Sequence, residues 1–216
     1  FGLVLNTVRE FSAAERYLRA GEWAQAPYRL TASLRNKVLG ILGLGRIGKA
    51  IAKRGEAFGL KIAYCGRSQQ ADIAYPFYAS PRALAEACDI LVIAAPGGPQ
   101  TRHLVNADVL HALGPQGFLI NIARGSLVDE AALIAALHAR TIAGAGLDVF
   151  AQEPHFSKDF LTTPHTVLLP HVGSASIETR QAMEDLLIAN VDAFAQGRPV
   201  LTPVPECVLA GLAAQC

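Results

Sequence analysis

The stretch Lys37-Val-Leu-Gly-Ile-Leu-Gly-Leu-Gly-Arg-Ile-Gly48 decides the fold of this 216-residue chain. Its first part, 37–42, is an apolar run typical of a buried strand, and 46–58 has the spacing of a helix. Between them lies the pattern GxGxxG, which binds a dinucleotide when it joins a strand to a helix. Gly43 is expected to permit the tight turn, Gly45 to let a pyrophosphate approach the backbone, and Gly48 to let helix and strand pack closely.

Outward from this motif, short apolar stretches alternate with stretches of helical periodicity. The expected strands are 37–42, 60–65, 73–77, 90–94, 117–122, 142–147 and 166–169. The expected helices that follow the motif are 46–58, 80–87, 106–112, 129–139 and 176–197. Strands that are apolar on both sides and alternate with helices indicate a parallel sheet covered on both faces. The sequence therefore predicts an α/β fold with a doubly wound parallel sheet of the Rossmann type.

The two ends of the chain depart from this alternation. Apolar residues recur at helical spacing near the start, which predicts one helix over 2–20 that ends at Gly21. Residues 22–36 show little periodicity and predict an irregular arm anchored by Trp23 and Tyr28. Beyond residue 198, three prolines exclude a regular helix.

The composition excludes several classes of protein. Apolar residues make up 51% of the chain, which is enough for a packed core, and the net charge of +1 gives no reason to expect nucleic acid or an anionic membrane as a partner. The four cysteines, Cys65, Cys88, Cys207 and Cys216, have neither CxxC spacing nor a histidine cluster beside them. We therefore expect free thiols, no metal site and a cytoplasmic location.

No apolar run is long enough to span a membrane, and no signal peptide is visible. The chain begins Phe-Gly-Leu, without Met, as expected of a fragment or a processed chain.

The choice of dinucleotide is expected to depend on the end of the second strand. Enzymes that use NAD usually carry an acidic residue there, which binds the ribose 2′-hydroxyl. Here the strand 60–65 is followed by Gly66-Arg67-Ser68, with no carboxylate. Arg67 can form a forked pair with a 2′-phosphate, and Ser68 can add a hydrogen bond. The alternative interpretation is that Arg67 is an ordinary surface arginine. We expect NADP(H) to be preferred, with NAD(H) possible.

Three further segments lie where predicted strands end: 121–126, 146–154 and 169–175. Ligands of an open α/β sheet bind outside the carboxyl ends of its strands, so these segments are expected to converge on one crevice. Their side chains suit the reduction of a ketone next to a carboxylate. His171 can donate the proton, Glu153 can orient and charge the imidazole, and Arg124 can hold the carboxylate. Taken singly, each is as easily a surface or loop residue, and only their joint placement favours catalysis.

The chain resembles the D-isomer-specific 2-hydroxyacid dehydrogenase family along nearly its whole length. The matching segments are Gly43–Gly48, Ala95–Asn106, Asn121–Ser126, Gly146–Pro154 and Pro170–Ser174. The resemblance implies Arg124, Glu153 and His171 as catalytic residues, Asp148 near the nicotinamide amide and Thr101 near the cofactor. The cofactor-binding residues expected in all are Gly43, Leu44, Gly45, Arg46, Ile47, Gly48, Arg67, Ser68, Ala95, Pro96, Thr101, Ile122, Ala123, Arg124, Asp148, His171, Gly173 and Ser174.

Within that family, Gly66-Arg67-Ser68 and Ala95-Pro-Gly-Gly-Pro resemble NADPH-dependent glyoxylate/hydroxypyruvate reductases. This implies an enzyme that transfers a hydride from NADPH to a small 2-oxoacid and gives the D-2-hydroxyacid. Phosphoglycerate and lactate dehydrogenases share the three catalytic residues and stay as alternatives. Two further alternatives are a non-catalytic NAD(P)-binding module similar to a corepressor and an inactive truncation.

The chain departs from the family in one respect: most of the substrate domain that precedes the linker helix in family members is missing. By resemblance, 1–20 is an interdomain helix, 21–198 the Rossmann domain and 199–216 a tail returning towards the missing domain. The segment 1–30 resembles the arm through which family members form homodimers.

Overall fold

The computed structural model describes residues 1–204, so Cys207, Cys216 and most of the predicted tail 199–216 lie outside the described residues. The chain divides into two compact units, Phe1–Pro170 and His171–Cys216, and each is described by itself.

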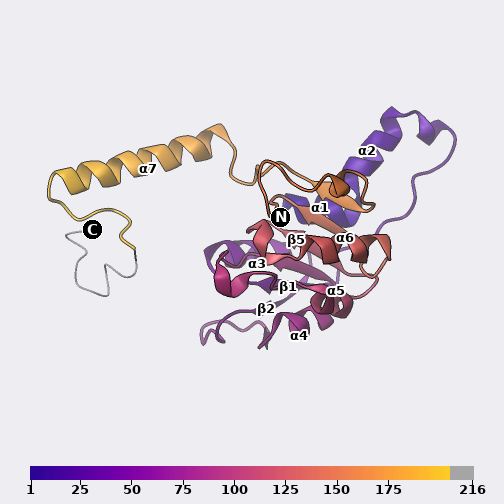
Figure 1. Ribbon diagram of the computed structural model, residues 1–216, viewed down its shortest axis with the longest axis horizontal. Helices are drawn as coiled ribbons and strands as arrows, with labels where there is room; N and C mark the ends of the chain where they lie inside the picture. The colour runs from indigo at the N-terminus through magenta and orange to yellow at the C-terminus, as the bar shows by residue number, and fades with distance from the viewer. Residues whose placement is uncertain (205–216) are drawn as a thin grey trace. The chain divides into compact units, whose positions relative to one another are not determined.

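The first unit is built on one seven-stranded sheet in which every pair of neighbouring strands is parallel (Figure 1). Its strands are β1 Val38–Leu42, β2 Lys61–Cys65, β3 Phe77–Tyr78, β4 Ile90–Ile93, β5 Phe118–Asn121, β6 Gly144–Leu147 and β7 Thr166–Leu168. Their spatial order is β3-β2-β1-β4-β5-β6-β7, so the chain runs outward from β1 on one side and then returns to build the other. The predicted doubly wound α/β fold is confirmed, and the order reverses between β1 and β4.

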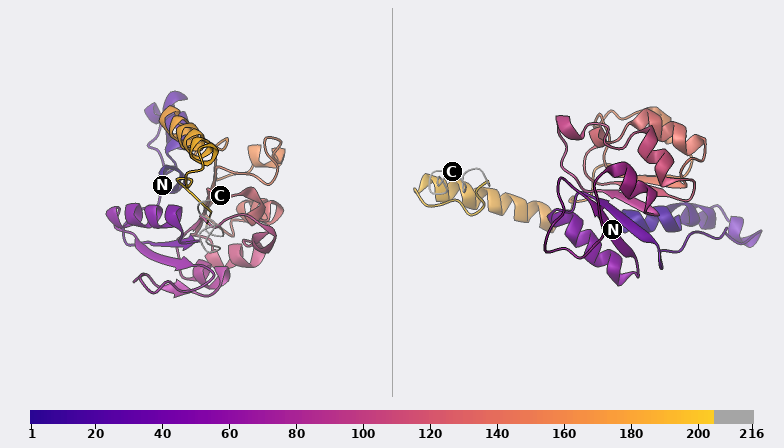
Figure 2. Two further views of the ribbon diagram at one scale, coloured as in Figure 1. Left: turned by 90° about the vertical axis from the view of Figure 1, so that its left-hand side faces the viewer. Right: turned by 90° about the horizontal axis from the view of Figure 1, so that it is seen from below.

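Helices cover both faces of the sheet because its strands are apolar on both sides. The helices of this unit are α1 Gly2–Arg9, α2 Phe11–Arg19, α3 Arg46–Ala57, α4 Pro81–Glu86, α5 Ala107–Leu113 and α6 Glu130–His138. One face packs against α1 and α3, where Leu39 and Ile41 are buried, and the other packs against α4, α5 and α6. Figure 2 shows the sheet between these layers. Short 3₁₀ turns connect the elements at Glu22–Ala24, Pro99–Thr101, Gly125–Leu127 and Lys158–Leu161.

The start of the chain differs from the single helix predicted over 2–20. It forms α1 and α2 with a break at Glu10, which is left-handed with φ 55°. The Asn6 side chain accepts a hydrogen bond from the Ser12 amide at 2.9 Å, and the Glu10 carboxylate binds the Arg29 guanidinium. The Asn6 side chain thus satisfies an amide that the break leaves without a helical partner, and the Arg29 contact holds the side chain of Glu10. Helical periodicity was correct for each half, but it could not locate partners that lie far along the chain.

The predicted strand 73–77 is also wrong in its bounds. Only Phe77 and Tyr78 pair with β2, opposite Tyr64 and Cys65. Pro76 has no N–H to donate, so a regular ladder cannot include it as a donor. The alternating apolar side chains before it, Ile73 among them, pack against the core from an irregular segment instead. The other predicted strands and helices are found, with ends shifted by a few residues at most.

The second unit contains one long helix, α7 Ile177–Ala195. Ser176 caps its first turn, because the hydroxyl accepts a hydrogen bond from the Thr179 amide at 3.2 Å. Beyond the helix, the Asn190 side chain donates to the Thr202 hydroxyl and accepts from its amide, which fixes the following segment against the helix. Within residues 1–204, neither this helix nor any other is long and apolar enough to cross a membrane.

Candidate functional site

The carboxyl ends of the central strands are aligned at one edge of the sheet. Leu42, the last residue of β1, stands opposite Cys65 of β2 and Ile93 of β4. Ile93 in turn stands opposite Asn121, and Asn121 opposite Leu147. Every loop that carries a predicted site residue of the first unit therefore leaves the sheet at this edge, as the sequence motifs require.

The glycine-rich loop turns tightly at this edge. Gly43 has φ 98°, and a Cβ there would lie 2.6 Å from the Cα of Ala95, so only glycine fits between the two strands. A Cβ on Gly48 would lie 2.3 Å from the Gly43 carbonyl oxygen, which explains why α3 can start so close to the strand. Gly45 precedes α3 without a side chain to cap it, and the space around its Cα is open. The first turn of α3 therefore presents backbone N–H groups suited to an anion.

A cleft of ≈ 700 Å³ lies at this edge, between the glycine-rich loop and the loops after β4 and β5. This volume is within the range of about 300–1,000 Å³ that is usual for small-molecule sites. The predicted residues that line it are Gly45, Arg46, Ile47, Ala95, Pro96, Ile122, Ala123 and Arg124. The structure thus brings together residues of three segments, of which Gly45 and Arg124 lie 79 positions apart along the chain (124 − 45).

The turn after β5 is shaped by a side chain that the sequence analysis did not single out for a role. Asn121 is 1% exposed. Its Oδ1 accepts from the Ala123 amide at 3.1 Å, and its Nδ2 donates to the Arg124 carbonyl at 3.0 Å. Gly97 gives the arginine room, because a Cβ there would lie 2.9 Å from the Arg124 Cγ. The Arg124 side chain is exposed at the cleft, where it can reach a carboxylate.

The loop after β6 is held against the turn that follows Arg124. A Cβ on Gly125 would lie 1.8 Å from the carbonyl carbon of Phe150, so the two backbones touch. Glu153 accepts from the Phe150 amide at 2.9 Å, and Glu130 accepts from the Ala151 amide at 2.8 Å. Glu130 and Gly125 thus position the segment that carries Glu153.

Sequence reasoning missed the role of Glu130 because the residue lies in α6, 21 positions from its partner Ala151. Its carboxyl group is half-buried. Burial raises the pKa of Glu130, and the Ala151 amide offsets only part of that effect. Asp148, which the resemblance places near the nicotinamide, follows β6 directly and is 4% exposed.

The loop after β4 is closed by Thr101. Its hydroxyl donates to the Pro96 carbonyl, at 3.0 Å, or to the Gly98 carbonyl, at 3.1 Å. This fixes the backbone of Pro96, which lines the cleft. The structure therefore assigns Thr101 a clear part in the shape of the loop, next to its predicted part in cofactor binding.

Arg67 and Ser68 follow β2 and are exposed. They leave the same edge of the sheet, one strand away from the glycine-rich loop, because Cys65 is paired with Leu42. The segment 66–70 contains no carboxylate.

The remaining predicted residues, His171, Gly173 and Ser174, belong to the second unit. His171 has a left-handed backbone with φ 54°. Glu153 belongs to the first unit, so its partnership with His171 stays a prediction from the sequence.

The thiols of the described cysteines do not line this cleft, although the Cys65 carbonyl accepts a hydrogen bond from the Gly43 amide at 2.9 Å. Cys65 and Cys88 are buried and free. Burial raises the pKa of Cys88 to about 12, so its thiol stays protonated near neutral pH.

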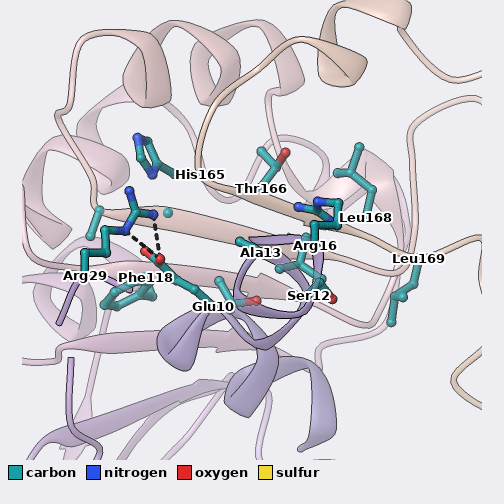
Figure 3. Close-up of a pocket in the computed structure, with 14 residues that line it drawn as sticks. Glu10, Ser12, Ala13, Arg16, Arg29, Phe118, His165, Thr166, Leu168 and Leu169 are labelled. Atoms are coloured by element: carbon teal, nitrogen blue, oxygen red, sulfur yellow. Dashed lines mark hydrogen bonds and ion pairs between the residues drawn. The ribbon is translucent and has the colours of Figure 1, made fainter. Parts of the chain in front are cut away.

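A second cavity, of ≈ 250 Å³, lies beside β7, α1 and the start of α2 (Figure 3). Arg29 and Arg16 line it, and Glu10 binds the Arg29 Nε at 2.8 Å. Burial lowers the pKa of His165, and the nearby charges of Arg140 and Arg29 lower it further. No sequence motif pointed to this cavity, and none of the predicted site residues lines it.

The comparisons with known proteins agree with this geometry. Residues 1–173 match the sequence model described as "D-isomer specific 2-hydroxyacid dehydrogenase, NAD binding domain". A glyoxylate/hydroxypyruvate reductase of Arabidopsis thaliana is 49% identical over 203 residues, which are 94% of this chain and 65% of the plant protein. A 2-ketogluconate reductase of Gluconobacter oxydans is 45% identical over 202 residues, again 94% of this chain and 65% of the relative.

Among solved structures, an NADPH-dependent glyoxylate/hydroxypyruvate reductase of Sinorhizobium meliloti in complex with NADP and malonate superposes with a TM-score of 0.90 and 50% identity. The superposition covers 95% of this chain and 65% of that one. This chain thus spans about two thirds of the length of its relatives, and the part it spans carries the coenzyme fold. It belongs to the D-isomer specific 2-hydroxyacid dehydrogenase family, to whose NAD binding domain residues 1–173 correspond.

Proposed function

We propose that this chain is the coenzyme-binding part of an NADPH-dependent reductase that converts glyoxylate or hydroxypyruvate to the corresponding 2-hydroxyacid, which is the D-isomer where the product is chiral. One observation carries the proposal: the glycine-rich loop and the Arg124 turn line the same cleft of ≈ 700 Å³. A bound dinucleotide and a carboxylate substrate would therefore meet there. The relatives named above act, by their names, on glyoxylate, hydroxypyruvate and 2-ketogluconate. These compounds share a ketone or aldehyde carbon next to a carboxylate, which is the group that a forked arginine binds well.

The preference for NADPH rests on Arg67 and Ser68. A guanidinium offers a planar pair of donors to a 2′-phosphate, and no carboxylate of 66–70 would repel it. The Sinorhizobium meliloti structure contains NADP, which supports the same choice for a chain that is 50% identical. The Arg67→Asp variant should shift the preference towards NADH, and an unchanged ratio of the two Michaelis constants would contradict this assignment.

In the proposed mechanism, the glycine-rich loop and the loop after β4 would hold the coenzyme, whose reduced nicotinamide would supply the hydride for the carbonyl carbon. Arg124 binds the substrate carboxylate and fixes the carbonyl within the cleft. His171 donates a proton to the carbonyl oxygen as negative charge develops there. Glu153 orients the imidazole, and Asp148 would hold the amide end of the coenzyme. The products are the 2-hydroxyacid and the oxidised coenzyme.

The decisive test of this function is the oxidation of NADPH by glyoxylate, measured in a chain extended to the length of its relatives. His171→Ala should lower kcat by about 10²–10⁴-fold while NADPH still binds, because only the proton donor is lost. Retention of a near-normal rate would remove His171 from the mechanism. A lack of turnover with any 2-oxoacid would favour a coenzyme-binding module without catalysis.

We further propose that the arm 11–30 forms the surface of a homodimer. The side chains of Trp23 and Leu30 are 66% and 100% exposed, and α2 buries none of its residues. The arm is nonetheless ordered by Tyr17, whose hydroxyl donates to the Ala26 carbonyl at 2.8 Å and whose ring contacts Tyr28. An exposed apolar arm held in a fixed shape is typical of an interaction surface. Sedimentation analysis should give a dimer that Trp23→Ala weakens, and a monomeric wild-type chain would contradict the proposal.

A further inference from the structure

The segment that follows β2 is tied to the glycine-rich loop by one side chain, Gln70. Its Nε2 donates a hydrogen bond to the carbonyl oxygen of Leu44 at 2.9 Å. Its backbone N–H donates to the hydroxyl oxygen of Tyr64 at 2.8 Å. Tyr64 lies in β2 and is fully buried, with its ring 5.4 Å from that of Phe77. Gln70 therefore connects a fully buried side chain of the sheet to the loop that faces the coenzyme cleft.

These two hydrogen bonds close a short loop, because Tyr64 precedes and Gln70 ends the stretch Gly66–Gln70. Arg67 and Ser68 lie inside that stretch with exposed side chains. An ion pair between Lys49 of α3 and Asp72, two residues after Gln70, also links this segment to α3, but it is long at 3.7 Å and exposed. Such a pair contributes little to holding a segment in place. The position of Arg67 relative to the glycine-rich loop thus depends on Gln70 far more than on this surface pair.

We propose that Gln70 is a positioning residue for coenzyme specificity: it holds Arg67 and Ser68 where they can bind a 2′-phosphate. The inference rests on the proposed preference for NADPH and deepens it. The physical reason is preorganisation. A loop already fixed in its binding conformation loses less conformational freedom when the phosphate binds, so more of the interaction energy appears as affinity.

The effect should be selective between the two coenzymes. NADH lacks the 2′-phosphate, so it does not use Arg67 or Ser68 in the proposed manner and does not depend on where the loop places them. Any disturbance that reaches Leu44 and the glycine-rich loop affects both coenzymes alike, because both carry the pyrophosphate. The ratio of the dissociation constants for NADPH and NADH therefore isolates the contribution of the two Gln70 hydrogen bonds, to Leu44 and to Tyr64.

The experiment is a fluorescence titration of the 216-residue chain with NADPH and with NADH. Gln70→Met keeps the length of the side chain but removes the donor to Leu44. Tyr64→Phe keeps the buried ring but removes the acceptor for the Gln70 amide. The matched control is Gln69→Met, because Gln69 is exposed and neighbours Gln70. Loss of one such hydrogen bond should weaken NADPH binding by about threefold to tenfold, with NADH binding and the control nearly unchanged.

The outcomes separate this inference from the proposed function. If the wild-type chain prefers NADH, the assignment of NADPH is wrong, and the proposed role of Gln70 in coenzyme specificity is wrong as well. If the wild-type chain prefers NADPH but Gln70→Met and Tyr64→Phe keep the same ratio, the proposed function stands and this inference is overturned. An equal loss for both coenzymes would also overturn it, since that indicates damage to the glycine-rich loop. Thermal unfolding of each variant checks that the fold survives. Gln70→Met tests the hydrogen bond to Leu44, and Tyr64→Phe tests the hydrogen bond to Tyr64.

Discussion

At the scale of single residues, the glycines of the site have different roles, because the space beside each Cα differs. Gly45 lies where the space is open, whereas a Cβ on Gly125 would meet the backbone of Phe150 at 1.8 Å. The open space beside Gly45 is the place where the motif admits a pyrophosphate. The contact at Gly125 instead joins the Arg124 turn to the loop of Glu153.

Alanine substitutions should therefore separate binding from stability. Gly125→Ala should lower the free energy of unfolding by about 3 kcal/mol, because backbone atoms rather than a flexible side chain must move. Gly45→Ala should change stability by less than about 0.5 kcal/mol, as surface substitutions usually do. Its methyl group should weaken NADPH binding by about tenfold, because it projects towards the pyrophosphate. Urea unfolding and coenzyme titration of both variants check this, and a stable Gly125→Ala variant would contradict the packing argument.

At the scale of elements, the starts of three strands are joined through Asp89, the residue before β4. Its carboxylate accepts from Lys37 Nζ and from the Val38 amide, both at 2.8 Å. Its backbone donates to the Val38 carbonyl and accepts from the Phe118 amide, both at 2.9 Å. Partial burial raises the pKa of Asp89, but the hydrogen bonds from Lys37 and Val38 outweigh it and hold the pKa below its ordinary value of 3.8.

This carboxylate should give the sheet a measurable dependence on pH. A depressed pKa in the folded state means that the unfolded chain binds the proton more readily, so the stabilisation is present above pH 3.8 and is lost as the pH falls through the folded pKa. Asp89→Asn should lower the free energy of unfolding at pH 7 by about 1 kcal/mol, a modest value because a third of the side chain reaches solvent.

Urea unfolding at a series of pH values from 7 downward tests this, with Asp72→Asn as the control at an exposed and long ion pair. The difference between wild type and Asp89→Asn should shrink in acid. A difference that stays constant at every pH would show that the charge of Asp89 is not its cause.

The elements also show how far a sequence can be interpreted. The apolar runs at β1, β4 and β5 are buried on both faces, so their composition predicted them well. The break at Glu10 was not predictable from periodicity, because Tyr28 and Arg29 bind its carboxylate from 18 and 19 positions away. The same holds for Glu130 at the site. Motifs locate residues next to their own strand, whereas contacts between loops depend on the finished fold.

At the scale of the whole molecule, the residues that the sequence predicts for one site are divided between the two units of the chain. Gly43–Gly48 and Arg124 belong to the first unit, and His171, Gly173 and Ser174 to the second. If the assignment from the sequence is right, NADPH should slow backbone hydrogen exchange in both sets of residues, because bound coenzyme stabilises the closed state of every segment it contacts.

Exchange measured by mass spectrometry with and without saturating NADPH tests this directly. Protection of 43–48 serves as the internal control for binding, and 171–174 is the segment in question. We expect both to be protected, by up to about a hundredfold at a coenzyme concentration one hundred times the dissociation constant. Protection confined to 43–48 would mean that His171 does not reach the coenzyme in this chain, because a proton donor to the reacting carbonyl has to lie beside the nicotinamide. Gly45→Ala, with its weaker binding, should reduce both effects in parallel if one bound molecule causes them.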